Sequence, residues 1–135
     1  MKGYGKNSMR FHHIGIATKN INNAISDYKK YHKVEFESEI IFDKEQDAEL
    51  AYLETNDGVN VEFISGKVVE NIIKKGITYY HLCYETEDLD KSISELYDKG
   101  AQIVSPPKPA ILFDMRRVAF LYMNYGVIEL LESGN

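Results

Sequence analysis

The stretch FHHIGIATKN at residues 11–20 decides the fold, because YYHLCYETED at residues 79–88 repeats its layout 68 positions later. In this register His13 falls on His81 and Thr18 on Thr86. Identical pairs continue as far as position 59: Ile25/Ile93, Ser26/Ser94, Ala51/Ala119, Leu53/Leu121, Asn56/Asn124, Gly58/Gly126 and Val59/Val127. One residue then drops out, so that Val61-Glu62-Phe63 matches Ile128-Glu129-Leu130. Matches that keep one register over such a length indicate an internal repeat of one supersecondary unit.

Each half of the repeat predicts a strand, a helix and three further strands. Residues 11–17 are a short apolar run, and Ile21, Ala24, Ile25 and Tyr28 recur at helical spacing. The first half is thus predicted to have a strand at 11–17, a helix at 21–32, and strands near 34–42, 49–54 and 59–64. The second half has a predicted strand at 78–85, a helix at 89–99, and strands near 101–105, 117–123 and 127–132. SPPKP at residues 105–109 holds all three prolines and is predicted to be a rigid loop.

These elements predict an α+β fold in which two tandem βαβββ modules form an open, curled mixed sheet around a cleft. The modules are expected at about 11–66 and 77–132, joined by a linking helix at about 67–76. The polar segment 1–10 is expected to be a flexible leader to a single domain at 11–135.

Composition narrows the classes of partner. The net charge of −5 argues against nucleic acid or an anionic membrane as the main partner. No apolar run approaches the 18 residues of a membrane span. The single cysteine, Cys83, cannot form an internal disulfide, so a reducing cytoplasm is the expected location. A small molecule is therefore the expected partner.

One histidine and one glutamate occupy matching places in the two halves: His13 with Glu62, and His81 with Glu129. The repeat selects His13 over its neighbour His12. A carboxylate in the middle of an apolar strand is costly to bury unless it is paired or binds a metal. Two imidazoles and two carboxylates form a ligand set suited to one divalent ion such as Zn, Ni, Co, Mn or Fe. Surface residues inherited by both halves would give the same pattern.

At these residues the chain resembles the vicinal-oxygen-chelate superfamily, which includes the glyoxalases, bleomycin-resistance proteins and dioxygenases. The resemblance rests on HHIGIA at 12–17, YHLCYE at 80–85 and GVIELL at 126–131. It implies that the expected cleft holds a metal bound by His13, Glu62, His81 and Glu129, and it implies a homodimer. Family members commonly act on substrates whose adjacent oxygens chelate that metal, such as an acyl-CoA or a thiohemiacetal.

Within this superfamily the opening segment is similar to that of methylmalonyl-CoA epimerases. The resemblance implies an isomerase that abstracts a proton next to a carbonyl through an enediolate, with Glu45 and Glu129 moving the proton. Arg116 and Arg117 are the candidate contacts for a CoA phosphate, and Tyr79 and Tyr122 are candidates to line the cleft. Alternatively, the two arginines are solvated surface charges and the two tyrosines pack in the core.

Three other functions stay open at this point. A lyase resembling glyoxalase I would use the same metal on a hemithioacetal. A metal-free protein of the bleomycin-resistance kind would only sequester a ligand, and such proteins typically lack the four metal ligands. A dioxygenase is disfavoured because the ferrous triad needs three protein ligands rather than four.

Overall fold

The computed structural model describes residues 9–134, in which a strand and a helix are twice followed by further strands, four in the first set and three in the second. The first set comprises β1 (Met9–Ala17), α1 (Ile21–Lys29), β2 (Val34–Glu37), β3 (Ile41–Asp43), β4 (Ala48–Thr55) and β5 (Val61–Gly66). A 3₁₀ turn η1 (Lys67–Val69) and helix α2 (Glu70–Lys74) follow. The second set comprises β6 (Tyr79–Thr86), α3 (Leu89–Asp98), β7 (Gln102–Ala110), a 3₁₀ turn η2 (Ile111–Phe113), β8 (Arg116–Met123) and β9 (Gly126–Glu132).

The chain divides into two compact units, which we describe separately. The N-terminal unit comprises residues 13–80, and the C-terminal unit comprises residues 81–134 together with 9–12. Strands β1 and β6 therefore each contribute residues to both units.

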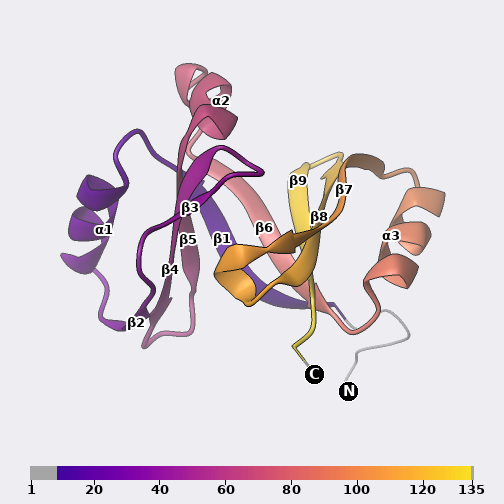
Figure 1. Ribbon diagram of the computed structural model, residues 1–135, viewed down its shortest axis with the longest axis horizontal. Coiled ribbons are helices and arrows are strands. Elements are labelled where there is room, and N and C mark those ends of the chain that lie inside the picture. Colours follow the sequence, from indigo (N-terminus) through magenta and orange to yellow (C-terminus); the bar gives the residue numbers. More distant parts are fainter. Residues whose placement is uncertain (1–8, 135) are drawn as a thin grey trace. The chain divides into compact units, whose positions relative to one another are not determined.

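The N-terminal unit is a sheet in the order β2-β4-β5-β1, with β3 paired on β4 (Figure 1). β1 runs parallel to β5, whereas the other pairs are antiparallel. Helix α1 packs on one face of this sheet. Its residues Ile21 and Ile25 bury themselves against four strand residues: Ala51, Leu53, Val61 and Phe63. Apolar burial on this face stabilises the unit and leaves the opposite face of the strands to polar groups.

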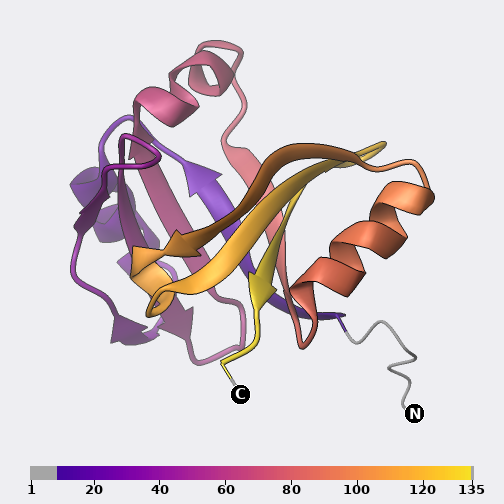
Figure 2. The same ribbon diagram turned by 45° about the vertical axis from the view of Figure 1, so that its right-hand side comes forward.

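The C-terminal unit repeats this arrangement with strands β6-β9-β8-β7, where β6 runs parallel to β9. Figure 2 shows β7 and β8 side by side along most of their length. Helix α3 covers the face formed by four apolar residues: Ala119, Leu121, Ile128 and Leu130.

Matching caps begin the two long helices. The side chain of Asn20 accepts a hydrogen bond from the backbone N–H of Asn23 at 2.9 Å, and that of Asp88 accepts one from Lys91 at 3.1 Å. Such N-caps satisfy backbone donors that have no partner in the first turn of a helix. Since Asn20 and Asp88 are 68 positions apart, the repeat extends to the local chemistry that starts each helix.

The predicted α+β class and its open mixed sheet are confirmed. The strand expected at 34–42 is instead two short strands, β2 and β3. The prediction of a loop at 105–109 was wrong, because these residues belong to β7. β7 is an edge strand with register shifts around Ser105, where proline costs no ladder hydrogen bond. Strand β1 begins at Met9, and residues 1–8 of the expected leader lie outside the described residues.

Between residues 9 and 134, no helix is long and apolar enough to cross a membrane.

Candidate metal centre

The N-terminal unit buries a histidine beside a glutamate. His13 on β1 is fully buried and Glu62 on β5 is 5% exposed. Nε2 of His13 lies 3.5 Å from Oε1 of Glu62. Ile14, Val61 and Phe63 pack with the helix-side core, so strand alternation turns His13 and Glu62 to the face away from α1. Local sequence alternation therefore puts both polar groups on one buried surface.

The C-terminal unit contains the matching pair. His81 on β6 and Glu129 on β9 are 4% and 3% exposed. Nε2 of His81 lies 3.1 Å from Oε1 of Glu129. The neighbours Ile128 and Leu130 belong to the core under α3, so this pair also faces away from the helix. The two units thus bury the same pair of residue types at equivalent positions of their strands.

An aromatic ring contacts each buried histidine edge-on. The ring of Tyr52 lies 5.9 Å from that of His13, and the ring of Phe120 lies 5.3 Å from that of His81. Tyr52 is the cross-strand partner of Glu62, as Phe120 is of Glu129. Each aromatic side chain therefore packs beside both members of its pair. Sequence analysis missed this role, although the Tyr52/Phe120 match in the repeat signals it.

The donor set fits a divalent metal ion. Each pair offers one imidazole nitrogen and one carboxylate oxygen, ligands that Zn and other first-row ions accept. With metal–ligand bonds of about 2.0–2.1 Å, two ligands of one ion stand roughly 3.0–3.4 Å apart. The observed separations of 3.5 and 3.1 Å are close to that range. Burial of a carboxylate without a cation would be costly, so the surroundings also favour a bound ion.

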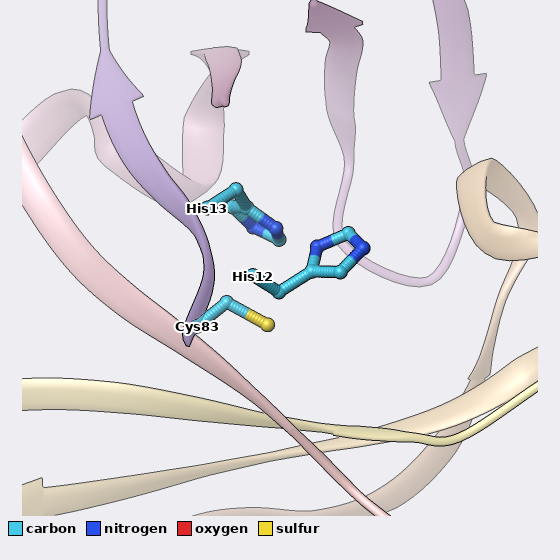
Figure 3. A group of neighbouring side chains, drawn as sticks. All are labelled: His12, His13 and Cys83. Carbon is cyan, nitrogen blue, oxygen red and sulfur yellow. The ribbon is translucent and has the colours of Figure 1, made fainter. Parts of the chain in front are cut away.

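His12 and Cys83 form a neighbouring group with a different donor set. Figure 3 shows the two side chains next to each other, and their ligand atoms lie within 4.8 Å. Cys83 is fully buried. His12 also packs at 5.5 Å against the ring of Phe113. This group contains the soft sulfur of Cys83 and no carboxylate. The repeat does not preserve it, because Gly15 stands at the position that matches Cys83. The harder nitrogen–oxygen pairs, His13 with Glu62 and His81 with Glu129, are the better candidates for binding a divalent ion.

Glu45, the predicted base, lies in the exposed turn between β3 and β4. Asp43, which is 5% exposed, holds this turn: its Oδ1 accepts the backbone N–H of Glu45 at 2.9 Å. Gln46 donates its side-chain amide to Oδ2 of Asp43 at 3.0 Å. On β4, Ala48 pairs with Gly66 and Tyr52 pairs with Glu62. The turn therefore begins about 13 Å along the strand from the Tyr52–Glu62 pair, at about 3.3 Å per residue.

Both predicted phosphate contacts have carboxylate partners in the C-terminal unit. Nη1 of Arg116 lies 2.8 Å from Glu85, and Nη2 of Arg117 lies 2.8 Å from Glu132 and 3.2 Å from Asp90. The hydrogen bonds from Arg117 hold the pKa of the Glu132 carboxyl below its ordinary value. A phosphate would have to compete with these ion pairs.

The two tyrosines proposed for substrate contact are both open to solvent. Tyr79 at the start of β6 is 74% exposed, and Tyr122 on β8 is 51% exposed. On β8, Tyr122 is two residues from Phe120 and so shares its face of the strand, the face away from α3.

Residues 12–120 match the family model of the Glyoxalase/Bleomycin resistance protein/Dioxygenase superfamily, and the chain therefore belongs to this superfamily. This is the superfamily that the repeated histidine- and glutamate-containing strands indicated in the sequence. No curated protein sequence matches the chain.

Solved structures share the fold at low identity. A hypothetical protein from Bacillus halodurans is 22% identical, with a TM-score of 0.76 over 95% of this chain and 96% of that one. Methylmalonyl-CoA epimerase from Mycobacterium tuberculosis is 18% identical, with a TM-score of 0.82 over 100% and 94%. A second methylmalonyl-CoA epimerase structure is 16% identical, with a TM-score of 0.69 over 93% and 95%. At these identities the likeness shows the fold alone.

Proposed function

We propose that this chain is a divalent-metal-dependent isomerase that abstracts a proton next to a carbonyl, in the manner of a methylmalonyl-CoA epimerase. The observation that carries this proposal is the duplicated pair, His13 with Glu62 and His81 with Glu129, buried on matching strands. Both pairs would bind one ion. The likeness of the fold to epimerase structures supports the choice of reaction.

The bound ion would supply Lewis-acid stabilisation of the negative charge that develops on the substrate oxygens. The chain's own residues do the rest. Tyr52 and Phe120 pack against the two histidines and restrict their ring orientation. The apolar neighbours of Glu62 and Glu129 exclude water, which strengthens electrostatic interactions at the site. An acyl-CoA with two adjacent carbonyl oxygens is the proposed substrate class, and a homodimer is the proposed assembly.

Exchange of the α-proton of methylmalonyl-CoA in D₂O tests the proposal. Protein reconstituted with Zn, Co, Ni, Mn or Fe is compared with protein treated with EDTA, and bound metal is measured by elemental analysis. We expect about one ion per chain and exchange that disappears with the metal. Stoichiometric metal without exchange would refute the epimerase reaction and direct the search to hemithioacetals. A protein that binds no metal would refute the metal centre itself.

A further inference from the structure

The N-terminal unit carries an acidic side chain on the same face as its His–Glu pair. Glu54 on β4 is two residues from Tyr52, and the Tyr52 hydroxyl donates a hydrogen bond to Oε2 of Glu54 at 3.0 Å. Ala51 and Leu53, between and beside them, pack in the core under α1. Tyr52 and Glu54 therefore project away from the helix, on the side of His13 and Glu62.

The strand register puts Glu54 level with His13. Val61 on β5 is the cross-strand partner of both Leu53 on β4 and Ile14 on β1. One step along each strand from this row lie Glu54 and His13, on the opposite face. Two strand spacings separate their backbones by about 10 Å. A small substrate next to His13 would therefore lie within reach of the Glu54 side chain.

The hydrogen bond from Tyr52 orients the Glu54 carboxylate without using all of its acceptor capacity. Tyr52 is 7% exposed and fixed by its ring contact with His13, so its hydroxyl is a rigid donor. Backbone hydrogen bonds with Ser38 also hold Tyr52: the N–H of Tyr52 donates to Oγ of Ser38 at 2.8 Å, and the N–H of Ser38 donates to the carbonyl oxygen of Tyr52 at 2.9 Å. Glu54 itself is exposed and can exchange a proton with water.

We propose that Glu54 is the catalytic base of the N-terminal unit and that Tyr52 is its positioning residue. The inference rests on the proposed proton-abstraction function. In the forward step the α-C–H bond breaks, and the proton moves to the free oxygen of the Glu54 carboxylate. The bonding electrons remain on the substrate as an enediolate. Return of a proton from Glu54, after exchange with solvent, restores the C–H bond on the same face and gives α-proton exchange. Inversion requires that a second proton donor protonate the enediolate on the opposite face.

The C-terminal unit supports this assignment by contrast. Phe120 stands at the position of Tyr52 and Tyr122 at the position of Glu54, 68 residues later. Neither side chain there offers a carboxylate held by a hydroxyl. The base that abstracts the α-proton is thus predicted to come from the N-terminal unit, while both units contribute metal ligands.

The test measures α-proton exchange, KM, and metal content in metal-reconstituted Glu54→Gln, Tyr52→Phe, Glu45→Gln and Glu49→Gln variants. Glu49 is the matched control, since it is exposed on the same strand but faces the other way. We expect Glu54→Gln to lower kcat at least about 100-fold and Tyr52→Phe about 10-fold. KM and metal content should stay within about 2-fold of wild type, a split that a purely structural role would not give.

Each outcome decides the assignment. Exchange in wild type that survives in Glu54→Gln, or a loss confined to Glu45→Gln, would overturn the role of Glu54 and leave the proposed function standing. Loss of metal or of folding in Glu54→Gln, judged by elemental analysis and circular dichroism, would make Glu54 structural. Absence of exchange in metal-loaded wild type would refute the proposed function, and the role of Glu54 with it.

Discussion

The N-terminal and C-terminal units bury the same pair of ligands but surround it differently. His13 with Glu62 and His81 with Glu129 occupy matching strands, each beside an aromatic ring. Around the first pair a tyrosine hydroxyl holds an exposed glutamate. Around the second pair the ring is a phenylalanine, and an arginine–glutamate ion pair ties the outer end of β8 to β9. The two units share the His–Glu pair that metal binding would need. They differ in side chains that would act on a substrate, such as the glutamate, or on stability, such as the ion pair.

The largest expected effect comes from removing one ligand in either unit. His13→Ala and His81→Ala should each weaken metal binding at least about 100-fold, because each removes a direct bond to the ion, a larger change than the 10–100-fold typical of supporting residues. Titration with Zn in the presence of a competing chelator measures the affinity. Equal losses, together with about one ion per wild-type chain, would indicate that both units serve one ion. Loss in only one variant would break the symmetry and restrict the metal to that unit.

A smaller effect is expected from the rings that contact the histidines. Tyr52→Leu and Phe120→Leu should each lower stability by about 0.5–1.5 kcal/mol beyond the loss of buried area, because an edge-on aromatic contact disappears. Urea unfolding of the metal-free proteins measures this change. Similar values would show that the two rings support their histidines alike, and a much larger cost at Tyr52 would show that its hydroxyl also stabilises the fold. The exposed Tyr31→Leu is the control.

The smallest effect concerns an ion pair that only the C-terminal unit has. Glu49 and Ser65 stand in the N-terminal unit where Arg117 and Glu132 pair across β8 and β9. Arg117 lowers the pKa of the Glu132 carboxyl from its ordinary 4.5. The pair therefore adds stability above about pH 4.5, which is lost as the pH falls through the lower folded pKa.

Replacement Arg117→Met should flatten this acid dependence. The variant is expected to lose less unfolding free energy than wild type as the pH falls below 4.5, as followed by urea unfolding at several pH values. Identical pH profiles would show that the ion pair contributes nothing measurable, as many surface pairs do.

Much of the fold followed from the repeat in the sequence. The match of FHHIGIATKN with YYHLCYETED predicted two βαβββ modules, and the spacing of Ile21 and Ile25 predicted the helix that covers the sheet. The sequence did not predict the break near Ser38 or the strand formed by residues 105–109. Both lie at the edges of the sheet, in or beside β2 and β7, where pairing depends on which neighbour is available rather than on local preference.

The candidate ligands could also be selected from sequence, because a polar residue that repeats inside an apolar strand has few other uses. His13 was separated from His12, and Glu62 from the many exposed acids, by the register of the repeat alone. The residues that surround those candidate ligands could be identified only from the tertiary structure. Which side of β4 carries Glu54, and that Tyr52 bonds it while contacting His13, depend on cross-strand register. Sequence spacing fixes which residues share a face, but only the pairing of distant strands decides which faces meet.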